Sequence, residues 1–293
     1  MKVVNMHPLF HSLRLYIKLA RPKHWLKNGL VFVPLLYAHN MAKPGLLLAT
    51  VQCFAAFCLL SSAVYIVNDI IDAAEDRKHP LKKNRPIASG ALAANRAVIV
   101  AAVLFVASLF LTVAGYGNYQ VLIFALLYAV LNLAYSFLLK HYAVIDCFCI
   151  AAGFVLRIFA GGAAGNSAIS EWLFLTMTAV SLFMAFGKRR GEMLQVAADD
   201  TRKVLASYEM QFLTGMIFVC AGLAVVFYAL WAMMNMSAMI YTTPLVLFIV
   251  SRYLLDIHGK TSHGDPTAII LGDKGLLIAV VIFGLLSVAL LYL

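Results

Sequence analysis

Long apolar runs separated by polar segments dominate the chain from about residue 25 to its end. Each run approaches the roughly 20 residues that a helix needs to cross about 30 Å of hydrocarbon, and lipid cannot hydrogen-bond an open backbone. The pattern predicts an all-α polytopic membrane protein of about nine transmembrane helices in one bundle, forming a single domain over residues 1–293. The expected spans are 25–40, 46–67, 96–115, 119–138, 143–163, 172–187, 211–232, 238–255 and 274–293.

Composition supports a membrane environment, and the charges orient the chain in it. The 293 residues are 63% hydrophobic and only 12% charged, outside the mixture of a soluble domain. All but two of the 23 Lys and Arg residues, Lys43 and Arg157, fall in the N-terminal segment or in and beside the even-numbered loops. We therefore expect a bacterial inner (plasma) membrane protein with its N-terminus and large loops cytoplasmic and its C-terminus outside. The net charge of +10 then faces the anionic inner leaflet and requires no nucleic acid.

The loop after the second span begins with a ladder of polar oxygens. Asn68, Asp72 and Asp76 recur every four residues, so they share one face if the helix continues past Asn68. Such oxygens suit Mg²⁺, which usually takes one or two carboxylates plus substrate phosphates, and Asp69 adds a donor at an adjoining position. Acids at the end of a spanning helix are costly unless something binds them. The ladder therefore predicts a magnesium site, the alternative being a solvated loop of mixed charge.

Basic residues follow the ladder. Pro80 breaks the helix, and Lys82, Lys83 and Arg85 come directly after it, where cations can pair with phosphate oxygens. An acidic ladder followed by a basic loop indicates a phosphate-bearing substrate.

The same stretch carries a family resemblance. NDxxDxxxDR at 68–77, followed by HPxKxxRPIASG at 79–90, resembles the first aspartate-rich motif of the UbiA superfamily of intramembrane prenyltransferases. Span number and loop order extend the resemblance over nearly the whole chain, and RPKHWLKN at 21–28 is similar to the start of the first helix in this group. In that superfamily the motif binds a diphosphate through Mg²⁺. The resemblance implies the same role for the ladder here.

The sixth loop departs from the commonest pattern of this superfamily. Most of its prenyl diphosphate transferases carry a second DxxxD group there, whereas this chain has Lys188, Arg189 and Arg190. Asp199 and Asp200 follow, but adjacent acids do not share a helix face. A cationic second site favours a substrate that brings its own phosphate without a metal.

Three segments together indicate one branch of the superfamily. The cationic sixth loop, YSFLLKHYAVID at 135–146 and LRIFAGGAAG at 156–165 are similar to the decaprenyl-phosphate phosphoribosyltransferases. In that branch a polyprenyl phosphate is the acceptor and 5-phosphoribosyl diphosphate is the donor. The resemblance therefore implies these two substrates as the partners of this chain.

Two charges within the fifth span predict a polar interior surface. Asp146 and Arg157 are eleven residues apart, on nearly the same helix face and about 16 Å apart along the axis. They do not pair with each other, and each either lines a cavity or is neutralised by a partner in the bundle. Lys140 lies at a helix end and either joins the site or extends to the membrane interface.

These residues define one mechanistic hypothesis. Asp72, Asp76 and Asn68 are the expected catalytic residues, with Asp69 as a further metal ligand on the donor diphosphate. An oxygen of the polyprenyl phosphate attacks carbon 1 of the ribose, and pyrophosphate leaves with inversion. The expected substrate-binding residues are Lys82, Lys83, Arg85, Lys140, Asp146, Arg157, Lys188, Arg189 and Arg190.

Two alternatives remain open at this point. The first is a prenyltransferase that moves a polyprenyl group from its diphosphate to an aromatic acceptor, although its second carboxylate motif is missing. The second is a transporter whose intramembrane charges mark a pathway, although the chain shows no evident internal repeat.

Overall fold

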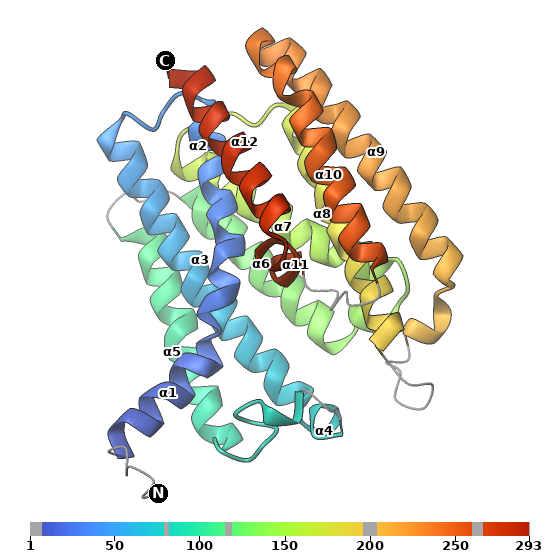
Figure 1. The fold of residues 1–293 in the computed structure, drawn as a ribbon. Coiled ribbons are helices and arrows are strands. Elements are labelled where there is room, and N and C mark those ends of the chain that lie inside the picture. The colour runs from blue at the N-terminus through green and yellow to red at the C-terminus, as the bar shows by residue number, and fades with distance from the viewer. Residues whose placement is uncertain (1–7, 79–81, 115–118, 196–203, 260–265, 293) are drawn as a thin grey trace, which may run out of the picture.

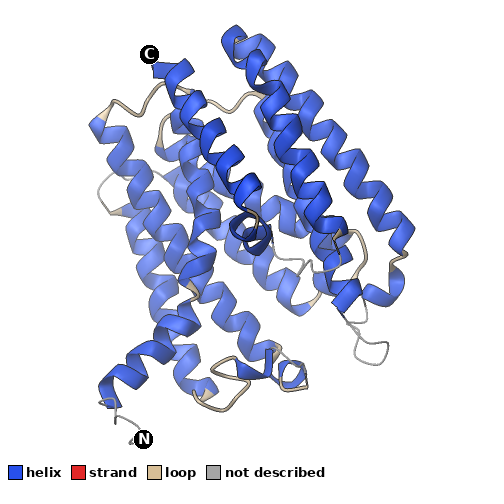
Figure 2. Ribbon diagram, viewed as in Figure 1, coloured by secondary structure: helices blue, strands red, loops and turns tan. Residues whose placement is uncertain are grey.

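The computed structural model describes residues 8–78, 82–114, 119–195, 204–259 and 266–292. These residues form helices joined by short connections, with no strand among them (Figure 2). The all-α architecture that the apolar runs predict is confirmed. Asp199 and Asp200 of the sixth loop and Pro80 after the ladder lie outside the described residues.

The N-terminal half contains most of the irregular elements (Figure 1). Its elements, with 3₁₀ helices denoted η, are α1 (Pro8–Ala20), η1 (Pro22–Val31), α2 (Phe32–Tyr37), α3 (Pro44–Ile71), α4 (Ala73–Asp76), η2 (Lys82–Asn84), α5 (Ala94–Val113), α6 (Tyr119–Phe137) and η3 (Leu139–His141).

The C-terminal half consists mainly of long helices. Its elements are α7 (Ile145–Ala164), α8 (Glu171–Gln195), η4 (Leu205–Ser207), α9 (Met210–Asn235), η5 (Ser237–Thr242), α10 (Thr243–His258), α11 (Pro266–Gly272) and α12 (Lys274–Tyr292).

Seven helical segments of the described chain are long and apolar enough to cross a membrane. They correspond to seven of the nine expected spans. The other two expectations, 25–40 and 172–187, fall on η1 with α2 and on α8. In α8 the apolar stretch is bounded by Glu171 at its start and Lys188 at its end, so its purely apolar part is short.

The first expected span is not a regular α-helix. Its first part falls in the 3₁₀ segment η1, which starts at Pro22, and the preceding Arg21 has a φ of 53° in the left-handed region. Runs of 3₁₀ helix this long are uncommon, and they frequently mark functional or strained sites. Packing of η1 against α3 and α7 holds it in this form.

The helices α3 and α7 form the interior of the bundle. More than half of the spanning part of each is buried, 61% for α3 and 56% for α7, against 22% for α5, α10 and α12. Their buried positions are rich in Ala, Gly, Cys and Ser, as expected where helices in lipid associate through close packing of small residues. Polar side chains on α3 and α7 are therefore shielded from lipid.

The two ends of the described chain lie at opposite ends of the bundle. In Figure 1, α1 and α4 lie at the lower end, and the last turn of α12 lies at the upper end. This arrangement matches an odd number of membrane crossings.

Candidate active site

Three buried carboxylates gather where α3 ends. Asp69, Asp72 and Asp76 are 2%, 6% and 4% exposed, and buried charges require partners. Asp69 forms an ion pair with Arg21 at the start of η1. One guanidinium nitrogen of Arg85, Nη1, lies 3.0 Å from Asp69 Oδ1 and 2.5 Å from Asp76 Oδ2. The carboxylates of Asp69 and Asp76 therefore converge on a single cationic group.

Asp72 faces a different partner. Asn68 Nδ2 donates to Asp72 Oδ2 at 2.9 Å, so the expected contact between these two members of the ladder is present. Lys140 of η3 pairs with Asp72 Oδ1, which links Lys140 to the acidic group. Backbone hydrogen bonds from Asp72 N to the Asn68 carbonyl (2.9 Å) and from Asp76 N to the Asp72 carbonyl (2.8 Å) continue the helical pattern, yet the carboxylate that shares Arg85 with Asp76 is that of Asp69.

The donors at this end of α3 suit a divalent metal ion. Mg²⁺ prefers carboxylate and amide oxygens and leaves positions for substrate phosphates, and these residues are Asn68, Asp69, Asp72 and Asp76. The described residues contain no ready-formed group of three or more metal-binding side chains. The placement of Arg85 Nη1 between two carboxylates shows that both can contact one positive centre.

A second part of the site is a cationic cavity inside the bundle. Its volume is about 140 Å³, and none of its lining residues is acidic. Three cations reach it from different elements: Lys27 from η1, Arg157 from α7 and Lys188 from α8. The other lining residues are Tyr65, Tyr128, Asn132, Tyr135, Cys149, Ile150, Gly153, Phe154, Met184 and Ala185. Cations and hydroxyl groups in a confined space favour an anionic ligand.

Arg157, beside this cavity, has no acidic partner among the described residues. Its Nε donates to Asn28 Oδ1 at 2.7 Å, Nη1 to the Gly153 carbonyl at 2.7 Å and Nη2 to the Tyr128 hydroxyl at 2.8 Å. The guanidinium carbon also lies 4.5 Å from the Tyr128 ring centroid. These neutral partners orient the guanidinium, and no described acidic side chain pairs with it, which suits the binding of an anion.

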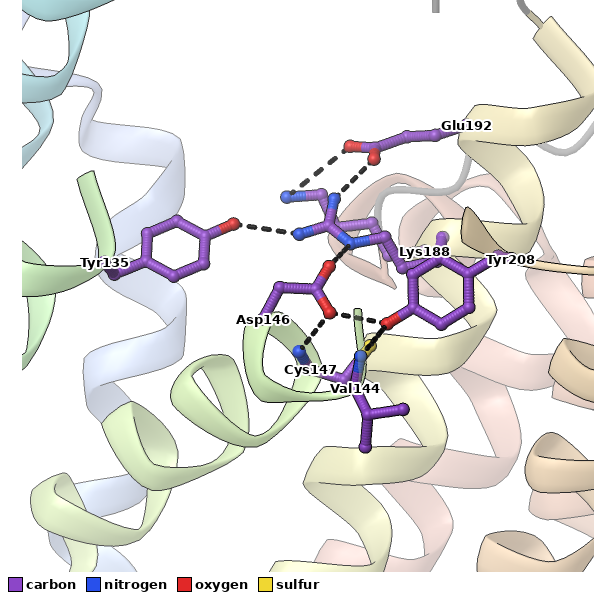
Figure 3. Close-up of polar contacts among 8 residues, drawn as sticks. Tyr135, Val144, Asp146, Cys147, Lys188, Glu192 and Tyr208 are labelled. Atoms are coloured by element: carbon purple, nitrogen blue, oxygen red, sulfur yellow. Dashed lines mark hydrogen bonds and ion pairs between the residues drawn. The ribbon is translucent and has the colours of Figure 1, made fainter. Parts of the chain in front are cut away.

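Asp146 behaves differently from Arg157, although both lie on α7. It is fully buried and forms an ion pair with Arg189, which is also fully buried (Figure 3). Arg189 further contacts Glu192 and the Tyr135 hydroxyl. Asp146 and Arg157 do not pair with each other, as expected. Of the two, only Arg157 lines the cavity, and the geometry of Asp146 and Arg189 favours support of the cavity wall over the expected contact with substrate.

Tyr208 completes the surroundings of Asp146. Its hydroxyl donates to Asp146 Oδ1 at 2.5 Å and accepts from the Val144 N–H at 2.6 Å. Burial, and then the hydrogen bond to the Asp146 carboxylate, raise the pKa of the Tyr208 hydroxyl above its ordinary value. The hydroxyl therefore stays protonated and remains a donor to Asp146.

The remaining expected cations lie in unequal positions. Lys82 is half-buried in η2 and Lys83 is exposed there, next to Arg85 and the acidic end of α3. Lys188 lines the cavity and lies 4.0 Å from Glu192. Arg190 instead donates to the Ile257 carbonyl of α10 at 2.6 Å, so its guanidinium is directed away from the cavity.

Several site residues are found only in the structure. Arg21 and Lys27 lie in the segment RPKHWLKN, whose resemblance to the superfamily gave no role to either residue. On α6, Tyr128, Asn132 and Tyr135 lie at spacings of four and three, which places them on one helix face. That polar stripe on an otherwise apolar helix is the signal that could have identified this wall of the cavity.

Comparisons with known proteins give the family of the chain. A model of the UbiA prenyltransferase family matches residues 30–267. A decaprenyl-phosphate phosphoribosyltransferase of Mycolicibacterium smegmatis is 36% identical over 284 residues, covering 88% of this chain and 86% of that protein. One of Mycobacterium tuberculosis is 33% identical over 274 residues, covering 88% of both chains. The resemblance to the phosphoribosyltransferase branch is thereby confirmed.

A solved structure shares the fold. The structure of a UbiA homolog from Archaeoglobus fulgidus bound to GPP and Mg²⁺ aligns with a TM-score of 0.75 and 17% identity, covering 95% of this chain and all of that chain. At this identity the likeness concerns the fold alone. With a family match over most of its length and close relatives that are enzymes, this chain belongs to the UbiA prenyltransferase family of membrane transferases.

Proposed function

We propose that this enzyme transfers the 5-phosphoribosyl group from phosphoribosyl diphosphate to a polyprenyl phosphate, releasing pyrophosphate, with Mg²⁺ as cofactor. The observation that carries the proposal is the division of the site into one part that offers carboxylate oxygens and a second part whose lining has cations and no acid. The acidic end of α3 suits a metal-bound diphosphate, and the cavity with Lys27, Arg157 and Lys188 suits a phosphate bound directly by cations. The names of the relatives support a polyprenyl phosphate as the acceptor and a phosphoribosyl group as the group transferred.

The donor lies at the acidic end in this proposal. Asn68, Asp69, Asp72 and Asp76 hold Mg²⁺, and Lys82, Lys83 and Arg85 contact the phosphates of the donor. When bound, the ion stabilises the negative charge that develops on the leaving pyrophosphate. Lys140 keeps the Asp72 carboxylate in place through their ion pair.

The acceptor phosphate lies in the cationic cavity, held by Lys27, Arg157 and Lys188. One of its oxygens forms a bond to carbon 1 of the ribose while the bond from carbon 1 to the diphosphate oxygen breaks. The electron pair of that bond leaves with pyrophosphate. Because the attacking oxygen is already anionic, no general base is required, and the anomeric carbon inverts.

The proposal includes a location in the bacterial inner membrane, with the site facing the cytoplasm. The positive-inside pattern of the sequence supports this orientation. A phosphorylated, water-soluble donor such as phosphoribosyl diphosphate would be reached from that side.

A labelling assay with purified protein in detergent tests the reaction. Decaprenyl phosphate, Mg²⁺ and phosphoribosyl diphosphate labelled in the ribose should give label in the lipid fraction. Donor labelled in the diphosphate should release label as pyrophosphate and leave the lipid unlabelled. A chelator of divalent metals should stop both, and added Mg²⁺ should restore them.

A parallel reaction tests the alternative, which is prenyl transfer to an aromatic acceptor. Geranyl diphosphate with an aromatic acid should give no prenylated product. Prenylation of the acid, together with unlabelled lipid in the phosphoribosyl reaction, would replace the proposal by a prenyltransferase activity.

A further inference from the structure

A buried ionic network contacts two residues that line the cationic cavity, Tyr135 and Lys188, and Figure 3 shows its hydrogen bonds and ion pairs. Asp146 and Arg189 are both fully buried, and their ion pair joins the start of α7 to the end of α8. Asp146 Oδ1 also accepts from the Cys147 N–H at 2.9 Å and from the Tyr208 hydroxyl. The carboxylate is thus held by donors from three sides.

Arg189 extends this network to the cavity. Its Nη2 donates to the Tyr135 hydroxyl at 2.8 Å, and its Nη1 contacts Glu192 Oε2. The other oxygen of Glu192 lies 4.0 Å from Lys188 Nζ. Tyr135 and Lys188 line the cavity, whereas Arg189 and Glu192 do not. The network therefore contacts two wall residues from behind.

The backbone at the start of α7, where Asp146 lies, is held in a fixed conformation. Val144 has a φ of 68°, which is a genuine outlier for a β-branched residue. Such a conformation persists where the surroundings over-determine it, and here the Val144 N–H donates to Tyr208, which in turn donates to Asp146. The start of α7 is thus held against the segment that precedes α9.

We propose that Arg189, held by Asp146, is a positioning residue for the acceptor phosphate. It fixes Tyr135 directly and Lys188 through Glu192, and it does not contact the substrate. The identity of the acceptor rests on the proposed function. A guanidinium presents five donors in a rigid fork, which explains how one side chain reaches Asp146, Glu192 and Tyr135 together. The single ammonium group of a lysine would retain the charge and lose this geometry.

A double variant tests the positioning role without leaving a fully buried charge unpaired, since Glu192 is partly exposed and keeps Lys188 at 4.0 Å. Removing one partner of a buried ion pair is strongly destabilising, whereas replacing both by apolar residues of similar size is often tolerated. Asp146→Leu with Arg189→Met should therefore insert and keep its unfolding temperature. Its KM for decaprenyl phosphate should rise about 10-fold or more, the scale of losing one hydrogen bond to a charged group, while the KM for phosphoribosyl diphosphate stays near the wild-type value.

Arg189→Lys provides the second variant, because it keeps the charge pair with Asp146. It should fold and show the same selective rise in the KM for the lipid. If the double variant does not accumulate in the membrane, the KM of Arg189→Lys for the lipid decides whether the positioning role holds. Arg252→Met is the control, because it removes an ion pair with Asp273 (2.6 Å) outside the cavity, and it should keep wild-type values of both KM and kcat.

A double-mutant cycle ties the effect to Tyr135. Tyr135→Phe alone should raise the KM for the lipid, and adding Arg189→Lys to it should raise the KM by less than the product of the two single effects. Independent, multiplicative effects would overturn the assigned link between Arg189 and Tyr135.

Binding of decaprenyl phosphate without donor separates this inference from the proposed function. If the wild type binds the lipid but transfers no ribose, the proposed function fails, and the dissociation constants of the variants still decide the positioning role. If both the double variant and Arg189→Lys bind decaprenyl phosphate with the wild-type dissociation constant, the positioning role is overturned. Failure of the wild type to bind decaprenyl phosphate would overturn it as well.

Discussion

At the scale of single residues, neighbours decide what each buried charge can do. Arg157 has neutral partners and remains an available positive charge beside the cavity, whereas Arg189 is compensated by Asp146 and Glu192. Burial alone does not distinguish the two guanidinium groups, since they are 4% and 0% exposed. The chemistry of their partners therefore favours a binding role for Arg157 in the proposed function and the proposed positioning role for Arg189.

Replacing Asp76 by Ala should lower kcat by about 100-fold or more, on the scale of removing one electrostatic contact from a transition state. The protein should still insert, because Arg85 keeps Asp69 as a partner at 3.0 Å. The rate of pyrophosphate release and the unfolding temperature measure the two effects. Glu75→Gln, an exposed carboxylate of the same segment, should retain wild-type turnover. Retained turnover in Asp76→Ala would refute the metal-site assignment.

Replacing Lys27 by Met should raise the KM for polyprenyl phosphate about 10-fold or more, since a hydrogen bond to a charged group contributes about 1.5 to 3 kcal/mol. The KM for phosphoribosyl diphosphate should change little. Steady-state kinetics with each substrate varied separately make the comparison. Lys23→Met is the matched control, because Lys23 is exposed on the same 3₁₀ segment. Equal effects of the two substitutions would argue for a general charge effect.

At the scale of elements, the close approach of η1 to α7 brings together the cations of the cavity. A Cβ at Gly161 of α7 would lie 2.0 Å from the carbonyl oxygen of Val31 in η1, so only glycine permits this distance. Asn28 of η1 can consequently reach Arg157 of α7, and its Nδ2 donates to Ser61 of α3 at 3.1 Å. One small residue thus aligns three elements around the cavity.

Gly161→Ala should destabilise the protein by about 1 to 3 kcal/mol, the usual cost of inserting a methyl group into a packed interior. It should also weaken lipid-phosphate binding, because η1 must shift away from α7. Thermal unfolding in detergent and the KM for the lipid provide the measurements. Gly215→Ala in α9 is the control, since a Cβ there meets nothing within 4 Å outside its own helix and Ala favours helix by about 1 kcal/mol. A neutral Gly161→Ala would contradict the close packing.

At the scale of the whole molecule, the bundle places its charged segments together. The charge pattern assigns to one side the loops and helix ends that carry the charges: the ladder at the end of α3, η2, η3 and the basic end of α8. The two ends of the described chain, α1 and the last turn of α12, lie at opposite ends of the bundle (Figure 1). The central helices α3 and α7 hold site residues in the interior of the bundle, near the side that the charge pattern predicts to be cytoplasmic.

We expect the N-terminus in the cytoplasm and the C-terminus outside. Green fluorescent protein should fluoresce when fused to the N-terminus, and alkaline phosphatase should be active when fused after Leu293. The reverse fusions serve as controls and should be inactive. Fluorescence from both ends would contradict an odd number of crossings and require a revised topology.

The sequence by itself determined the features that depend on local spacing and composition. Apolar runs define the spans, the distribution of Lys and Arg predicts their orientation, and the four-residue spacing brings Asn68 next to Asp72 within one helical turn. The motif at Asn68 to Arg77 indicated the family. These inferences hold because periodicity and transfer into lipid depend on neighbouring positions in the chain.

Only the tertiary structure decided which charges meet. Asp146 and Arg189 are 43 residues apart, and Arg157 and Asn28 are 129 apart, so their pairing depends on how helices pack and on a glycine that permits close approach. The sequence grouped Lys188, Arg189 and Arg190 as equivalent cations. In the structure Lys188 lines the cavity, Arg189 belongs to the buried network and Arg190 contacts α10. Successive residues of a helix point in directions about 100° apart, and what lies in each direction is set by packing over the whole bundle.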